Sequence, residues 1–136
     1  MDSKAEQLKK CTRNFAVRIV RLFRASPNCS EARVVGQQLL RSGTSVAANY
    51  RAACKARSPA DFISKLGIVE EEADETVFWL EFLVDTGMVR RERMLNLTDE
   101  ARQLTAIFAA SRLTAKGNNR KSQIGNRKSN DGSRNG

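Results

Sequence analysis

The sequence predicts an all-α protein that folds as a four-helix bundle. Four segments repeat apolar residues at three- and four-residue steps, which is the period of an amphipathic helix. The chain contains only two prolines, so long stretches can be helical. Its 136 residues suffice for one hydrophobic core and leave no room for a second.

The first helix is predicted at about residues 4–25. Its apolar face is formed by residues that recur every three or four positions: Leu8, Cys11, Phe15, Ile19, Leu22 and Phe23. Basic residues line the opposite face, among them Arg13, Arg21 and Arg24. Pro27 ends the helix, because proline restricts the residue before it and has no N–H to donate.

The second helix is predicted at about residues 31–56, with Ser30 as its N-cap. Its inward face comprises Val35, Leu39, Ser42, Val46, Tyr50 and Ala53. Arg41, Arg51 and Lys55 lie on the other side. A glycine such as Gly43 costs about 1 kcal/mol relative to alanine inside a helix. Since small residues surround it, we expect another helix to approach closely at this point.

The third helix is predicted at about residues 59–86, with Ser58 as its cap, Pro59 in its first turn and Gly87 after its end. One apolar stripe consists of Phe62, Leu66, Val69, Ala73, Val77, Leu80 and Val84. A second apolar set falls outside this stripe: Ile68, Phe78, Trp79 and Phe82. Because a four-helix monomer would leave this second set exposed, we predict that it forms an oligomer interface.

The fourth helix is predicted at about residues 98–115, with Leu104, Ile107 and Phe108 facing inward. Residues 1–115 would then form the bundle. From Lys116 onward the composition is dominated by Gly, Asn, Ser, Lys and Arg. Such a segment buries too little apolar surface to offset the entropy lost on ordering, so residues 116–136 are predicted to be a disordered basic tail.

The composition excludes several kinds of chemistry. The chain has no histidine, which removes Ser/His and Cys/His catalysis and histidine-containing metal sites. Carboxylates cluster at residues 70–75, but a bundle di-metal site would need Glu-x-x-His pairs beside them. We interpret this run as a solvated face, or as one that meets a basic face on a neighbour. No catalytic residue, metal ligand or cofactor is predicted, and we do not expect an enzyme.

Positive charge is concentrated in the first half of the sequence and in the tail. The chain has 24 Lys and Arg against 15 Asp and Glu, for a net charge of +9. Residues 1–60 hold 12 basic and 3 acidic residues, whereas residues 61–115 are net acidic. A basic surface with a basic tail is typical of nucleic-acid binding through phosphate contacts. The candidate contacts are Arg13, Arg21, Arg24, Arg41, Arg51 and Lys55. The alternatives are that the basic charge binds another acidic partner or that it serves solubility alone.

The cysteines and the apolar runs indicate the compartment. Cys11, Cys29 and Cys54 are odd in number and show no CxxC spacing, which favours free thiols in a reducing cytoplasm. The first residues do not form a signal peptide, and no apolar run approaches the ~18 residues that a membrane span needs. We therefore expect a cytoplasmic protein with no membrane partner.

The longest ordered motif, RSGTSVAANYR, occupies residues 41–51. It is followed by ARS at 56–58, DFISKL at 61–66, EEADET at 71–76 and WL at 79–80. Together these segments closely resemble the bacterial four helix bundle protein family, which includes proteins encoded by intervening sequences in 23S ribosomal RNA genes. The resemblance covers about residues 5–115 and leaves the tail out.

This resemblance implies an antiparallel up-and-down bundle that assembles as a homopentamer. Related accessory variability proteins of diversity-generating retroelements have a basic surface and work with a reverse transcriptase and nucleic acid. The family has no established enzymatic activity. Many relatives carry a glutamate after the position of Asn49, whereas Ala52 and Ala53 follow Arg51 here, so no role of that carboxylate carries over. Two hypotheses remain: a homo-oligomer that binds RNA or DNA, and an oligomeric interaction scaffold without a direct nucleic-acid role.

Overall fold

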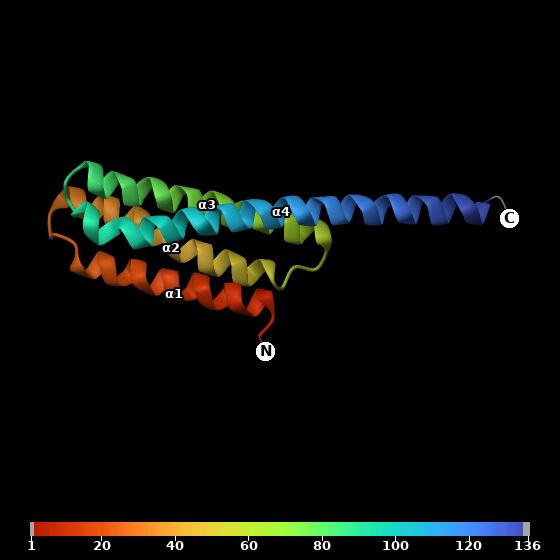
Figure 1. Cartoon of the computed structure of the whole chain (residues 1–136), viewed down its shortest axis with the longest axis horizontal. Coiled ribbons are helices and arrows are strands. Elements are labelled where there is room, and N and C mark those ends of the chain that lie inside the picture. The colour runs from red at the N-terminus through yellow and green to blue at the C-terminus, as the bar shows by residue number, and fades with distance from the viewer. Residues whose placement is uncertain (1, 135–136) are drawn as a thin grey trace.

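The computed structural model describes the backbone of residues 2–134 and the side chains of residues 2–125. The four helices are α1 (Lys4–Ala25), α2 (Ser30–Ala53), α3 (Pro59–Asp85) and α4 (Arg91–Arg134). They run alternately up and down, and each packs against the next one along the chain (Figure 1). The predicted all-α, up-and-down four-helix bundle is therefore confirmed.

The core lies between the inward faces of the helices. Every residue predicted for the inward face of the second helix is buried. On α1, Phe15 and Ile19 are fully buried, but Cys11 is exposed, contrary to prediction. The buried position beside it belongs to Thr12, whose hydroxyl bonds the Leu8 carbonyl oxygen at 2.9 Å instead of remaining unpaired in the core.

The ends of the first three helices follow the predicted breaks with one exception. The Ser58 hydroxyl accepts a hydrogen bond from the Asp61 N–H at 3.1 Å and caps α3, as predicted. Gly87 follows α3 with a φ of 75°, which glycine adopts without strain. The predicted Ser30 cap is wrong, because the extended residue before α2 is Cys29 and Ser30 already belongs to the helix. No side-chain hydrogen bond caps this end of α2.

Gly43 lies where α1 and α2 approach closely, as its surroundings predicted. A Cβ atom at this position would be 3.0 Å from Cγ1 of Ile19 on α1. On the other side of α2, the buried hydroxyls of Ser42 and Thr76 lie 3.0 Å apart and join α2 to α3. Small residues in this stretch therefore allow α2 to contact both of its neighbours.

The fourth helix differs most from the prediction. It begins at Arg91 rather than near residue 98, because a continuous buried stripe starts at Met94 and includes Leu97, Ala101, Leu104 and Phe108. Ile107 flanks this stripe and is 37% exposed, contrary to prediction.

The same helix does not end at Ala115. It continues to Arg134 and projects beyond the other helices (Figure 1). Adding a residue to an existing helix costs little, because each one forms a further backbone hydrogen bond. The structure thus corrects the predicted helix end, while the division into a packed bundle and a basic tail stays a prediction. Residues 135–136 lie outside the described residues.

Candidate nucleic-acid interface

All six predicted contact residues are exposed; apart from Arg41 they are Arg13, Arg21, Arg24, Arg51 and Lys55. Among the residues whose side chains the structure describes, none of these five forms a salt bridge. The first three belong to α1, and the last two lie at the end of α2 and in the turn after it. Their charges are therefore accessible to an anionic partner.

Arg41 has a different environment, although it was predicted with the same group. Its guanidinium bridges α2 to α3, at 3.1 Å from Oε2 of Glu72 and in a second ion pair with Glu75. The hydrogen bond from Arg41 is the largest cause that lowers the pKa of Glu75. Two carboxylates thus neutralise Arg41 within the bundle, and it is a poor candidate for a phosphate contact.

The acidic run at residues 70–75 contacts both neighbouring helices of the same chain. Besides the pairs with Arg41, Glu70 accepts a hydrogen bond from Nε of Arg112 on α4 at 2.6 Å. This contact raises the pKa of Arg112. Glu71 and Asp74 are exposed to solvent. The carboxylates of α3 therefore form ion pairs with basic residues of α2 and α4. This agrees with the second interpretation of the acidic run, a face that meets basic residues on a neighbour.

The exposed basic residues do not form one patch. Arg24 lies in the last turn of α1 and Arg51 in the last turn of α2, so they occupy opposite ends of the bundle. A helix of the length of α2 spans roughly 35 Å at a rise of about 1.5 Å per residue. A long polyanion could contact both ends, whereas a small anion could not.

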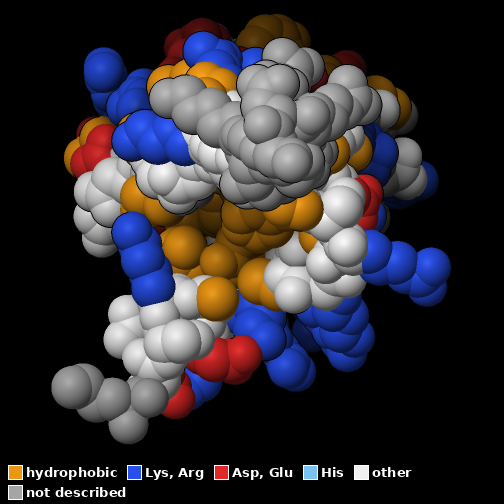
Figure 2. Space-filling model, turned by 90° about the vertical axis from the view of Figure 1, so that its right-hand side faces the viewer, with side chains coloured by type: hydrophobic (Ala, Val, Ile, Leu, Met, Phe, Trp, Pro, Cys, Tyr) orange, Lys and Arg blue, Asp and Glu red, His pale blue; other side chains and the backbone are white. Residues whose placement is uncertain are grey.

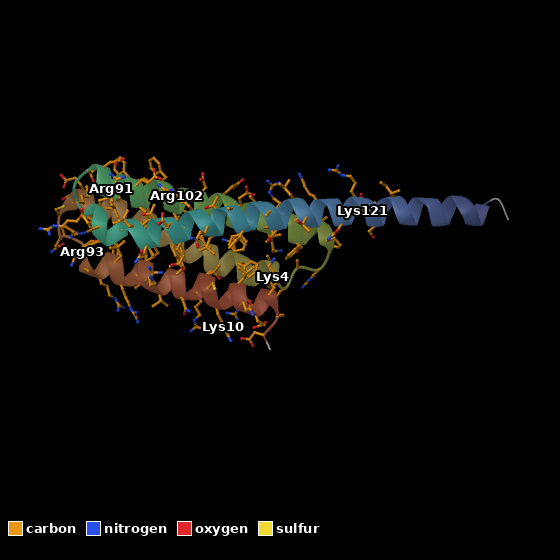
Figure 3. The ribbon with its side chains drawn as sticks, in the orientation of Figure 1. Lys4, Lys10, Arg91, Arg93, Arg102 and Lys121 are labelled. Carbon is orange, nitrogen blue, oxygen red and sulfur yellow. The ribbon has the colours of Figure 1, made fainter. Side chains whose placement is uncertain are left out.

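Another group of basic residues, which the sequence analysis missed, lies at the end of the bundle where α4 begins. Arg90, Arg91 and Arg93 surround the start of this helix, and Figure 3 shows Arg91 and Arg93 there, far from Lys121 on the projecting part of α4. Three arginines within four residues was the available signal. The sequence prediction missed these arginines because it placed residues 90–93 in the loop before the fourth helix.

The predicted interface residues lie mainly on the surface. Phe78 is 54% exposed, and Phe82 and Ile68 are also exposed. Phe78 stacks on Phe82 with ring centroids 5.8 Å apart, and the half-buried Trp79 packs edge-on against Phe78 at 4.9 Å. The Trp79 Nε1 atom is buried and has no hydrogen-bond partner among the described residues. We refer to Phe78, Trp79 and Phe82 as the aromatic cluster.

An apolar hollow opens at the opposite end of the bundle, between α1 and α4 (Figure 2). Two adjoining cavities of about 700 and 640 Å³ share Tyr50 and Phe62 in their walls. Burial raises the pKa of the Tyr50 phenol, with a smaller contribution from Cys54. Lys4 and Arg57 are the charged residues that line these cavities, so the rim of the hollow is positive.

Two further observations concern the described residues alone. They contain no group of three or more Cys, Asp or Glu side chains placed to hold a metal ion. None of the described helices is both long and apolar enough to cross a membrane.

These features define a small up-and-down helical bundle with a basic surface and an exposed aromatic cluster. The chain belongs to the 23S rRNA-intervening sequence protein family, whose model matches residues 4–110. A solved structure from Bacteroides thetaiotaomicron, described as a protein with unknown function from the S23 ribosomal protein family, is similar with a TM-score of 0.73 and 38% identity. The match covers 81% of this chain and 98% of that one. No curated protein matches the chain. The resemblance seen in the sequence motifs is thus confirmed.

Proposed function

We propose that this protein is a cytoplasmic, non-enzymatic homo-oligomer that binds nucleic acid, preferentially RNA, through its exposed basic residues. The observation that carries the proposal is the set Arg13, Arg21, Arg24, Arg51 and Lys55, exposed and without carboxylate partners in the described part of the chain. Neutralising phosphates with such residues releases counterions and supplies most sequence-independent affinity.

The choice of RNA over DNA is supported by the names attached to related proteins. The description of the matching family model names 23S rRNA, and the description of the similar solved structure names a ribosomal protein family. The basic residues are not interleaved with exposed aromatic rings, because Phe15 and Tyr50 are buried. Contacts to the phosphate backbone, rather than stacking on unpaired bases, therefore suit this surface.

The test is the salt dependence of RNA binding. We expect the full chain to bind a fluorescently labelled ribosomal RNA fragment at low salt, with log affinity falling linearly against log salt. Changing Arg13, Arg21 and Arg24 to Gln should flatten this slope by about 0.7 for each phosphate that the variant no longer neutralises. Changing the same three residues to Lys keeps their charge and should preserve the slope.

The projecting part of α4 should contribute charge without contributing to the core. Removal of residues 116–136 is expected to weaken RNA binding and to leave the thermal unfolding of the bundle unchanged, because Lys116, Arg120 and Lys121 are exposed. Absence of any affinity for ribosomal RNA fragments or duplex DNA at low salt would contradict the proposal.

The aromatic cluster supports the second candidate, an oligomeric interaction scaffold without a nucleic-acid role. A contiguous exposed apolar group is typical of protein–protein contacts. Under this hypothesis the chain would assemble, and its charge would serve solubility. A protein that oligomerises but shows no salt-dependent RNA affinity would favour the scaffold.

A further inference from the structure

The end of the bundle where α1 turns into α2 and α3 turns into α4 contains a cavity between the two turns. Its volume is about 540 Å³. One wall consists of Leu22 and residues 25–27, and the other of residues 87–90 and Arg93. The side chains of Val89 and Met94 are buried, which anchors the backbone that carries Arg90 and Arg93. We refer to this cavity as the turn-end pocket.

The charge that lines the turn-end pocket has a single sign. Arg90 and Arg93 are the charged residues of its wall, both are exposed, and within residues 2–125 neither forms a salt bridge. Four arginines on the sides of the bundle are paired instead with carboxylates of other helices: Arg18, Arg41, Arg102 and Arg112. Among the described side chains, Arg90 and Arg93 thus differ from these four paired arginines and share the lack of a carboxylate with Arg13 and Arg21 on α1.

The local backbone contributes both signs: the start of α4 adds positive potential, whereas the last turn of α1, which supplies Leu22 and Ala25 to the wall, ends in carbonyl groups. Helix α4 begins at Arg91, so its first N–H groups and the positive end of its dipole lie at the same end of the bundle. The guanidinium group presents a planar fork of donors that matches the oxygen atoms of a phosphate. Two such groups on the same wall of the cavity can contact one phosphate together.

Arg91 does not belong to this arrangement. It lines a separate cavity of about 240 Å³ together with Arg102 and three carboxylates, Glu81, Asp85 and Asp99. This second cavity therefore carries charges of both signs, whereas the turn-end pocket is lined by positive charge alone. This contrast restricts the inference to Arg90 and Arg93.

We propose that the turn-end pocket binds a phosphate group of a nucleic acid through Arg90 and Arg93. The inference rests on the proposed nucleic-acid function and adds a contact point that none of the six residues predicted from the sequence provides. A phosphate within the strand and a phosphate at its 5′ end have the same chemistry, and both fit the pocket.

The double variant Arg90→Gln, Arg93→Gln tests this site against a matched control, Lys4→Gln, Arg57→Gln. The control also removes two exposed charges, but at the other end of the bundle. For a labelled single-stranded ribosomal RNA fragment, we expect the affinity of the pocket variant to fall roughly tenfold at low salt and its salt slope to flatten by about 0.7, because one phosphate is no longer neutralised. The affinity of the control should fall much less. An equal decrease in both variants would overturn the proposal.

Thermal unfolding followed by circular dichroism should be the same for wild type and the pocket variant, because both side chains are exposed. RNA with a 5′-phosphate and RNA with a 5′-hydroxyl distinguish the two sources of phosphate. A decrease in affinity confined to the 5′-phosphorylated RNA assigns the pocket to a strand end, and an equal decrease for both RNAs assigns it to the backbone. Either result supports the proposal.

Pyrophosphate alone separates failure of the pocket from failure of the proposed function. If calorimetry shows that wild type binds pyrophosphate and the pocket variant does not, while RNA binds neither, the pocket stands and the nucleic-acid function fails. If RNA binds wild type and both variants alike and pyrophosphate does not bind, the pocket is wrong and the proposed function stands. If wild type binds neither ligand, both are wrong.

Discussion

Glu75 and Arg41 form an ion pair between α3 and α2, and the hydrogen bond from Arg41 lowers the pKa of Glu75 below its ordinary value of 4.5. A carboxyl group with a lowered pKa in the folded state stabilises the fold above its unfolded pKa, and this contribution disappears as the pH falls. We expect Glu75→Gln to reduce the acid-induced decrease in stability, by less than about 1 kcal/mol because the pair is partly exposed. Urea unfolding at about pH 7 and pH 3 measures the difference.

The matched control for this prediction is Glu71→Gln. Glu71 belongs to the same acidic run but is exposed and forms no salt bridge within the described residues. Its substitution should leave the pH dependence close to that of wild type. If Glu75→Gln also behaves like wild type, the ion pair does not couple protonation to folding.

Gly43 and Gly67 are both helical but differ in what an added methyl group would contact. At Gly67 the nearest atom is Cδ of Arg112 at 3.7 Å, which is an ordinary contact, whereas at Gly43 it is the buried Ile19 at 3.0 Å. We expect Gly67→Ala to raise the free energy of unfolding by about 0.5–1 kcal/mol through helix propensity. Gly43→Ala should raise it less or lower it, because Ile19 must shift in a packed core. Urea unfolding compares them, and an equal increase would contradict the close approach.

At the level of the elements, the beginnings of α2 and α3 differ in their capping. Ser58 accepts a hydrogen bond from Asp61 N–H, whereas Cys29 caps α2 with extended backbone but no side-chain bond. We expect Ser58→Ala to lower the free energy of unfolding by about 1 kcal/mol and Cys29→Ser to raise it by about 0.5 kcal/mol. Urea unfolding measures both changes. Cys11→Ser, at an exposed position within α1, should produce no such increase.

The accuracy of the predicted boundaries depends on local signals. Pro27, Ser58–Pro59 and Gly87 act on their immediate neighbours, so the ends of α1, α2 and α3 could be predicted to within a few residues. The start of α4 has no such signal. The segment at residues 98–100 resembles a helix start, but Thr98 is buried and lies inside α4 rather than before it. The apolar spacing from Met94 was the better indicator.

The candidate site could be predicted only in part, for an electrostatic reason. Helical periodicity identifies which basic residues are exposed, and all six were placed correctly on the surface. It does not indicate which carboxylates face them. Arg41 meets Glu72 and Glu75, which are distant in sequence, and Arg90 and Arg93 meet none among the described residues. Such pairing depends on how neighbouring helices are aligned.

For the molecule as a whole, α3 organises the charge. It packs between α2 and α4, and its carboxylates bind Arg41 on one side and Arg102 and Arg112 on the other. Four of its carboxylates thus form ion pairs with neighbouring helices. Among the described residues, the unpaired basic residues lie at the ends of the bundle, on the outer face of α1 and on the projecting part of α4, and the chain has a net charge of +9. This distribution favours a long polyanion over a compact acidic ligand.

The aromatic cluster and the apolar hollow lie toward opposite ends of the bundle. Contact between two different surfaces of like subunits is heterologous, and such contacts close into rings when the rotation allows. A ring is consistent with the homopentamer that the sequence resemblance implies. It would also present each basic group several times, so that weak contacts could combine through effective concentration.

We therefore expect sedimentation velocity at micromolar concentration to show a species several times heavier than the 15.2 kDa chain, with five chains the expected number. Phe78→Glu should shift it toward the monomer, because it places a charge in a contact that excludes water. Trp79→Glu should do the same, but Trp79 also packs against the core, so its failure to assemble could follow from unfolding. Phe78 is more than half exposed in the monomer and avoids this ambiguity.

Val34→Glu provides the control for assembly. Val34 is 61% exposed on α2 and lies outside the aromatic cluster, so a charge there should leave the sedimentation coefficient unchanged. Circular dichroism should show the same helical content in wild type, Phe78→Glu and Val34→Glu. A wild-type protein that sediments as a single 15.2 kDa chain would refute the oligomer, and the aromatic cluster would then have to contact a different protein. Failure to assemble in Phe78→Glu but not in Val34→Glu would place the interface at the aromatic cluster.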